Sequence, residues 1–267
     1  MRPGTDTPVI AAMDALHATA RFSDRVADYV RWRPDYPAAL LEWLHRELGV
    51  TPDWRVADIG AGTGISSGLF LDAGHRVTAV EPNAAMRDAA IARLGGNSRF
   101  RAVDGRADAT GLPDGSVDLV AAAQAFHWFD PETARREFRR ILKPGGLAVI
   151  FWNSRRLRGT PFLEGYEALL QRHGADYASV AERHADDERM RAWFGDGLRG
   201  VAHFEHGQWL DFDGLRGRLL SSSYAPGAGH PGHEPMLRAL RELFDATAEG
   251  GVVHLAYDTR VFAGEVP

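Results

Sequence analysis

The sequence contains no cysteine among its 267 residues. Disulfide bonds, thiolate nucleophiles, iron–sulfur clusters and cysteine-based zinc sites are therefore excluded. It also contains no run of about 18 apolar residues, the length that a membrane-spanning helix needs. Residues 1–20 lack the basic start and apolar centre of a secretory signal peptide. We therefore expect a cytoplasmic protein that does not work at a membrane.

An excess of positive charge is missing as well. The 31 basic residues are outnumbered by 36 acidic residues, and the formal net charge is −5. This negative net charge argues against a protein that binds nucleic acid without sequence specificity. Two histidine groupings, His203-x-x-His206 and His230-x-x-His233, bring no third ligand on firm geometry, so we expect no metal site.

The sequence does have the composition of a globular protein. Hydrophobic residues make up 45% and charged residues 25%, both close to the average for folded domains. A chain of 267 residues corresponds to one large domain, or to one domain with an inserted subdomain.

Short apolar runs alternate with helical patterns through residues 37–152. Strands are expected at 55–59, 76–80, 100–103, 117–123 and 147–152, and helices at 37–48, 65–73, 84–94 and 131–142. This alternation indicates βαβ units and a parallel sheet. The almost continuous apolar run at 117–123 is typical of a strand that is covered on both faces.

Residues 154–200 differ from the rest of the chain. They are polar, and their pattern predicts helices around 162–172, 177–182 and 187–193. Strands at 203–212 and 252–262 and helices at 214–220 and 234–248 follow. We therefore expect a loose tail at 1–20, a sheet domain formed by 21–153 and 201–267 with cap helices in 21–50, and a helical insertion or lid at 154–200.

A glycine-rich turn, Gly60-Ala61-Gly62-Thr63-Gly64, joins the first predicted strand to the next helix. Such a turn lets a ligand approach the backbone, where amide groups and the helix dipole favour negative groups. Enzymes that bind NAD, FAD or S-adenosylmethionine share this feature. The spacing departs from the dinucleotide fingerprint G-x-G-x-x-G, because Ile65 replaces the third glycine.

Two carboxylates flank this turn. Asp58 would repel a pyrophosphate, whereas it would attract a ligand that carries an ammonium and a sulfonium group. The alternative is that Asp58 bonds only the amides of the turn. Glu81 ends the second strand, 21 residues after Gly60, where an acidic side chain accepts hydrogen bonds from ribose hydroxyls. The alternative for Glu81 is a solvated strand end.

Residues 56–64 resemble motif I of the class I S-adenosylmethionine-dependent methyltransferases. Four later segments are similar to further landmarks of that family: Gly105–Asp108, Leu112–Asp118, Gln124–Asp130 and Leu142–Gly146. Residues 33–37 (Arg-Pro-Asp-Tyr-Pro) resemble a segment of its type 11, trans-aconitate-methyltransferase-like subgroup. The resemblance covers about residues 20–153 and fades through 154–200.

The resemblance implies a Rossmann-like α/β fold with a seven-stranded, mostly parallel sheet, helices on both faces and a helical cap insertion. It implies S-adenosylmethionine as cofactor and S-adenosylhomocysteine as product. Glu81 would bind the ribose, and Ala107 with Asp108 the adenine, with Asp104 as the alternative to Asp108. The implied cofactor-binding residues are Tyr29, Arg33, Asp58, Gly60, Ala61, Gly62, Thr63, Gly64, Glu81, Pro82, Met86, Ala107, Asp108, Gln124, Ala125 and His127.

Residues 124–129 follow the fourth strand, at the sheet edge where ligands bind in open α/β folds. His127 is the candidate catalytic residue, because imidazole titrates near neutral pH and can act as a general base. The alternative is that His127 only contacts the cofactor. The expected acceptor-binding residues are Trp128, Phe129, Trp152 and Tyr224. Arg155, Arg156 and Arg158 are candidates to bind a carboxylate or phosphate of the acceptor.

Three functions are consistent with these patterns. The first is methyl transfer by in-line displacement to a small-molecule acceptor, carried out by a monomer or homodimer. The second is a nicotinamide-dependent oxidoreductase on a similar sheet, against which Ile65 and Asp58 both argue. The third is a non-catalytic protein that binds S-adenosylmethionine.

Overall fold

The computed structural model describes residues 31–175, 177 and 187–267. The expected tail at 1–20, Tyr29 and most of the predicted helix at 177–182 lie outside the described residues. Within the described ranges, no helix combines the length and the apolar character needed to cross a membrane.

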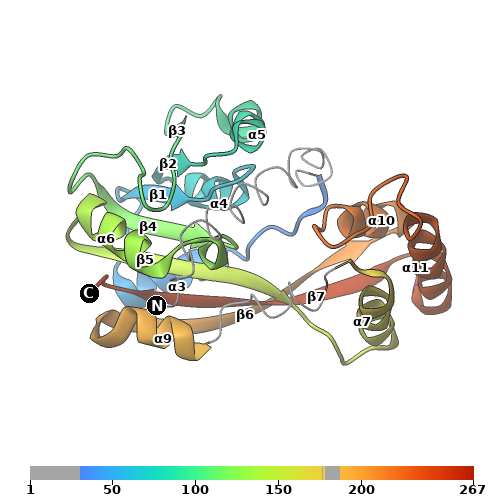
Figure 1. The fold of residues 1–267 in the computed structure, drawn as a ribbon. Coiled ribbons are helices and arrows are strands. Elements are labelled where there is room, and N and C mark those ends of the chain that lie inside the picture. The colour runs from blue at the N-terminus through green and yellow to red at the C-terminus, as the bar shows by residue number, and fades with distance from the viewer. Residues whose placement is uncertain (1–30, 176, 178–186) are drawn as a thin grey trace, which may run out of the picture.

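A single seven-stranded sheet forms the centre of the molecule, with strand order β3-β2-β1-β4-β5-β7-β6 (Figure 1). The strands are β1 (Arg55–Ile59), β2 (Arg76–Val80), β3 (Phe100–Val103), β4 (Val117–Ala123), β5 (Leu142–Arg155), β6 (Leu198–Leu210) and β7 (Val253–Gly264). Neighbouring strands are parallel from β3 through β5, whereas β7 is antiparallel to both β5 and β6. The predicted Rossmann-like, mostly parallel sheet is therefore confirmed.

Helices cover the sheet on both faces. They are α3 (Ala39–Leu48), α4 (Ile65–Asp72), α5 (Ala84–Leu94), α6 (Pro131–Ile141) and α9 (Asp187–Phe194), with a short 3₁₀ helix η2 (Gly195–Gly197) after α9. Strand β4 explains the two layers, because successive side chains of a strand point to opposite faces. Leu119 packs in one core with α3 and α4, and Val120 packs in another with α6 and α9. The apolar run at 117–123 is thus covered on both faces, as predicted.

Local capping signals fix the helix starts near the ligand-binding edge. The side chain of Asn83 accepts a hydrogen bond from the Met86 amide and begins α5. Asp130 accepts from the Thr133 amide, and Pro131 follows at the first helical position of α6. Short polar side chains at such positions satisfy amides that have no partner within the helix.

Strand β5 is longer than predicted in both directions. It begins at Leu142 instead of 147, and an irregularity in its pairing with β4 accommodates residues 143–146. At its other end it continues to Arg155, which pairs with Tyr257 of β7. The polar residues 153–155 carry no strand pattern of their own. Their conformation comes from hydrogen bonding to a strand about 100 residues away, which local propensity does not report.

The strand predicted at 203–212 is displaced toward the N-terminus, since β6 ends at Leu210. Asp211 interrupts it, because its side chain accepts a hydrogen bond from the Gly214 amide and caps the next helix. This helix, α10, therefore spans Phe212–Leu220 and begins two residues before the predicted start.

The long strands β5, β6 and β7 extend beyond the rest of the sheet, and a group of helices packs on their far end (Figure 1). This group, the helical lobe, consists of α7 (Pro161–His173), α10 and α11 (His233–Thr247). It has a core of its own with the ends of β6 and β7. Segment 154–200 thus supplies α7 to the lobe and α9 to the main sheet. Its boundaries as an insertion and its action as a lid stay predictions.

Candidate cofactor and acceptor site

The glycine turn lies at the carboxyl end of β1, in the middle of the sheet. Gly60 and Gly62 have φ angles of 68° and 56°, in the left-handed region that side chains disfavour. A Cβ atom on Gly60 would lie 2.7 Å from the Cβ of Ala125, whereas one on Gly62 would meet nothing within 4 Å. The turn is therefore packed against residue 125 on one side and open on the other.

Asp58 lies beneath this turn and is completely buried. Its Oδ2 accepts hydrogen bonds from the hydroxyl groups of Ser66 (2.7 Å) and Ser67 (2.6 Å) at the start of α4. Its Oδ1 has no partner among the described residues. Burial, opposed by these hydrogen bonds, raises the pKa of Asp58 to about 6. The sequence analysis did not predict a role for these two serines, because no local pattern indicates that α4 directs their side chains toward β1.

The raised pKa of Asp58 predicts a pH-dependent stability. A carboxyl group with a higher pKa in the folded state destabilises the fold once it is charged. The cofactor-free protein should therefore lose up to about 3 kcal/mol of unfolding free energy as pH rises from about 4 to about 6. Asp58→Asn should abolish this loss and raise the Tm at pH 7, while weakening cofactor binding.

Thermal denaturation between pH 4 and pH 7 measures this effect. Asp72→Asn, at an exposed position at the end of α4, is the matched control and should keep the wild-type slope. A variant at position 58 with the same pH slope as the wild type would show that Asp58 carries no such cost.

Glu81 follows β2 and contacts the turn at Gly62, on its open side. Its Oε2 accepts a hydrogen bond from the Gly62 amide (2.9 Å), and its Oε1 accepts from the Asn83 amide (2.8 Å). Burial raises the pKa of this carboxyl above its usual value, and the two amide bonds oppose the shift. Glu81 is therefore tied to the loop backbone, and the alternative of a solvated strand end does not hold.

The residues implied for the adenine side lie on two neighbouring segments. Pro82 is exposed and Met86 is buried in α5, while Ala107 is half-buried against the main core. Asp108 forms an ion pair with Arg106 at 2.6 Å. The alternative residue, Asp104, lies 3.5 Å from the Arg87 guanidinium, so both aspartates have a cationic neighbour.

A buried carboxylate from α6 anchors the same segment. Glu137 accepts hydrogen bonds from the amide (2.8 Å) and hydroxyl (2.6 Å) of Thr110, and from Arg140. The Arg140 guanidinium and the Thr110 donors lower the pKa of Glu137 to about 2. Glu137 therefore stays charged at neutral pH and fixes the loop that follows Asp108.

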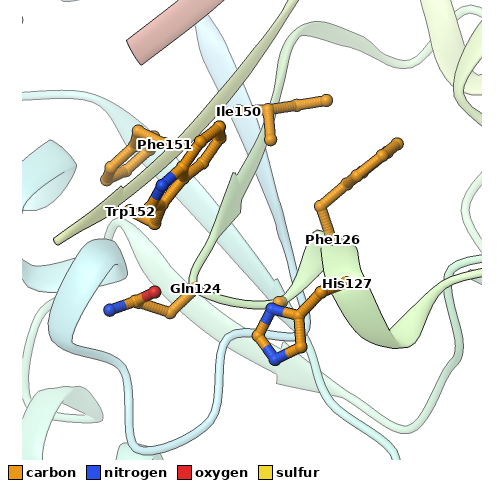
Figure 2. Close-up of a pocket in the computed structure, with 7 residues that line it drawn as sticks. Gln124, Phe126, His127, Ile150, Phe151 and Trp152 are labelled. Atoms are coloured by element: carbon orange, nitrogen blue, oxygen red, sulfur yellow. The ribbon is translucent and has the colours of Figure 1, made fainter. Parts of the chain in front are cut away.

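The segment after β4 forms the other wall. Gln124 adopts a φ of 54°, unusual for a residue with a side chain. A 3₁₀ helix, η1 (Phe126–Trp128), follows it. Figure 2 shows Gln124, His127 and Trp152 around one pocket, while the Phe126 side chain points away from His127. The pocket is lined by Gln124, Ala125, Phe126, His127, Ile150, Phe151 and Trp152.

The predicted acceptor-binding residues divide into two groups. The centroids of the His127 and Trp128 rings lie 4.8 Å apart. The Phe129 ring lies beside the glycine turn, because a Cβ atom added to Gly60 would be 3.3 Å from it. Trp152 lines the pocket with His127. Tyr224 is in the helical lobe, where its ring meets that of Tyr177. Binding of an acceptor by these residues stays a prediction.

Two of the candidate arginines, Arg155 at the end of β5 and Arg156 directly after it, have protein partners. Arg155 pairs with Glu167, and Arg156 pairs with Asp258 (2.7 Å) and Glu205. Arg33 donates a hydrogen bond to the Ser221 carbonyl (3.0 Å) and so ties the N-terminal segment to the helical lobe. In the part of the chain that the structure describes, no group of three or more acidic or histidine side chains is arranged to bind a metal ion.

The residues around the glycine turn fit S-adenosylmethionine. Buried polar atoms are nearly always hydrogen-bonded, yet Asp58 Oδ1 and Thr63 Oγ1 have no partner among the described residues. A ligand that presents ammonium donors at the turn would satisfy the Asp58 oxygen. Glu81 lies beside the same turn as a carboxylate acceptor for hydroxyl donors.

Comparisons with known proteins agree with this geometry. A family profile described as a methyltransferase domain matches residues 57–150. An uncharacterised methyltransferase of Schizosaccharomyces pombe is 34% identical over 169 residues, which cover 62% of this chain and 64% of that protein. The chain thus spans a little under two thirds of that relative.

Two further likenesses cover more of the chain. The 2-methyl-6-phytyl-1,4-hydroquinone methyltransferase of Synechocystis is 32% identical over 226 residues, covering 74% of this chain and 69% of that one. A solved structure of a candidate type II methyltransferase from Anaeromyxobacter dehalogenans has a TM-score of 0.62 and 26% identity, covering 88% of this chain and 98% of that chain. The chain therefore belongs to the class I S-adenosylmethionine-dependent methyltransferases.

Proposed function

We propose that this chain transfers a methyl group from S-adenosylmethionine to a small-molecule acceptor. The observation that carries the proposal is the buried Asp58 oxygen, which has no partner among the described residues, beside a glycine turn that is open at Gly62. The family supports the cofactor. The Synechocystis relative is named for a hydroquinone substrate, which supports a small acceptor. The segment at 33–37 supports placement in the trans-aconitate-methyltransferase-like subgroup.

S-adenosylmethionine supplies an activated methyl group on a sulfonium when it is bound. The protein then has to orient the acceptor for in-line displacement, and orientation supplies most of the acceleration. Asp58 and the glycine turn hold the methionyl end, and Glu81 holds the ribose. His127 lies in the wall formed after β4 and accepts a proton from an acceptor that must lose one.

Calorimetric titration tests the cofactor, and product analysis tests turnover. S-adenosylhomocysteine should bind to one site per chain, and NADH should not bind. Methylated product should form when a panel of small acceptors is supplied with S-adenosylmethionine. Binding of NADH alone would support the oxidoreductase instead. Cofactor binding with no turnover of any acceptor would support the non-catalytic binding protein.

Segment 154–200 is proposed to act as a lid on this site. Its helix α7 lies in the helical lobe, which the Arg33–Ser221 hydrogen bond connects to the N-terminal segment. Amides of α7 and α9 should exchange more slowly when S-adenosylhomocysteine is bound, because a ligand suppresses opening. Hydrogen exchange read by mass spectrometry measures this. Equal protection with and without the ligand would show that the segment is only structural.

A further inference from the structure

One arginine of the helical lobe is buried and has no acidic partner among the described residues. Arg218 lies in the last turn of α10 and is 6% exposed. Its Nε donates to the Tyr257 hydroxyl (2.9 Å), and its Nη1 donates to the Ser222 hydroxyl (3.0 Å). In the ranges that the structure describes, both of these partners are neutral hydroxyl groups, and no carboxylate forms an ion pair with Arg218.

Two other arginines nearby, in contrast, each have an acidic partner. Arg155 has Glu167 as its partner, and Arg156 has Asp258 and Glu205. An unpaired buried charge costs several kcal/mol in lost hydration. The carboxyl-terminal dipole of α10 offers about half a negative charge at most. Among the described residues, no acidic side chain therefore balances the charge of Arg218.

A second polar group near Arg218 has no hydrogen-bond partner in the part of the chain that the structure describes. The Tyr166 hydroxyl is buried, with its residue 1% exposed, and no described group hydrogen-bonds it. Arg155 lies over the Tyr166 ring at 5.1 Å, and Tyr166 belongs to the same core cluster as Tyr257, to which Arg218 donates. Burial raises the pKa of this phenol, so it stays protonated and remains a hydrogen-bond donor.

A chain of contacts leads from this cluster to the pocket at the sheet edge. The Tyr257 ring stacks on His206 with a centroid distance of 5.5 Å. His206 Nε2 lies 3.0 Å from Asn153 Oδ1, and Gln124 Nε2 donates to the Asn153 carbonyl (3.0 Å). Gln124 lines the pocket with His127. Arg218 is therefore connected to the candidate methyl-transfer site through hydrogen bonds and one ring stack.

We propose that Arg218 and Tyr166 form an anchor for a single carboxylate group of the methyl acceptor. This proposal rests on the proposed function, because it names the class of acceptor. Glu167 balances Arg155, so one positive charge remains, and one carboxylate neutralises it. A phosphate dianion or a tricarboxylate would bring excess negative charge into the buried cluster. The surrounding tyrosine rings favour an acceptor with an aromatic or apolar body.

Two substitutions separate this role from a structural one. Arg218→Met removes a buried charge that no described carboxylate balances, and Tyr166→Phe removes an oxygen that no described group hydrogen-bonds. Both variants should keep or raise the Tm of the unliganded protein. A merely structural arginine or tyrosine would instead lower the Tm when it is replaced. Arg199→Met is the control, since Arg199 on β6 already has the Glu265 carboxylate as its partner.

The binding experiment uses the full chain saturated with S-adenosylhomocysteine, at constant ionic strength. The probes are acetate and benzoate, with benzamide as the neutral counterpart and phosphate and a tricarboxylate as more highly charged anions. Benzoate should bind the wild type at least about tenfold more tightly than benzamide does, and more tightly than the highly charged anions. Arg218→Met should lose this preference, Tyr166→Phe should weaken benzoate binding, and Arg199→Met should change neither.

Two outcomes would overturn the proposal. One is that neither acetate nor benzoate binds the wild type better than Arg218→Met; the other is that phosphate or the tricarboxylate binds best. Tyr166→Phe keeps the test usable if the methionine variant does not fold. Binding of S-adenosylhomocysteine is measured in the same samples. Its loss in the wild type would contradict the proposed function, whereas normal cofactor binding without carboxylate preference contradicts only the Arg218 anchor.

Discussion

Glu81→Ala should weaken binding of S-adenosylhomocysteine about 10- to 100-fold, since each charge-assisted hydrogen bond to ribose contributes about 1.5–3 kcal/mol at best. The carboxylate also accepts hydrogen bonds from the Gly62 and Asn83 amides. Its loss therefore removes a ribose acceptor and loosens the turn at the same time. Calorimetric titration measures the affinity.

The fold should survive this substitution. Burial raises the pKa of Glu81, so the charged carboxylate is not a large source of stability in the cofactor-free protein. Glu81→Gln should also bind weakly, because an amide group cannot accept both backbone hydrogen bonds. Asp88→Ala, at an exposed position on α5, is the matched control and should bind normally. Unchanged affinity in Glu81→Ala would show that this residue does not bind the ribose.

His127→Ala should lower kcat by about 10²- to 10⁴-fold, the usual contribution of a general base, with little change in cofactor affinity. The basis is its place in η1, in the pocket that Gln124 and Trp152 also line (Figure 2). If His127 contacts only the cofactor, affinity should fall instead and kcat should survive at saturation. Steady-state kinetics at saturating cofactor, combined with calorimetry, distinguish the two roles.

The pH dependence gives a second test of the same residue. A base must be unprotonated to act, so kcat should rise with pH in the wild type as imidazole loses its proton. That rise should disappear in His127→Ala. His203→Ala, on β6, is the control and should retain it. A flat profile in the wild type, with chemistry rate-limiting, would exclude the base and leave catalysis to orientation alone.

Local sequence patterns determined most of the parallel half of the fold. Strands β1 to β4 and helices α4 to α6 begin and end within a residue or so of the predicted positions. The physical reason is that each is bounded by a signal in its own segment. Examples are the asparagine cap of α5, the Asp130-Pro131 start of α6 and the apolar run of β4. Motif I and Glu81 were predicted for the same reason, because motif I coincides with a glycine turn and Glu81 with the end of a strand.

Only the tertiary structure decided what these groups meet. Asp58 was predicted from its position, but its serine partners and its oxygen without a partner depend on how α4 packs on β1. The extension of β5 depends on pairing with β7. The sequence likewise does not indicate which arginine will be buried away from a carboxylate, because no local pattern distinguishes Arg218 from the other arginines. Among the described residues, folding brings a carboxylate to Arg155 and a tyrosine hydroxyl to Arg218. Long-range packing sets this difference, which no local pattern encodes.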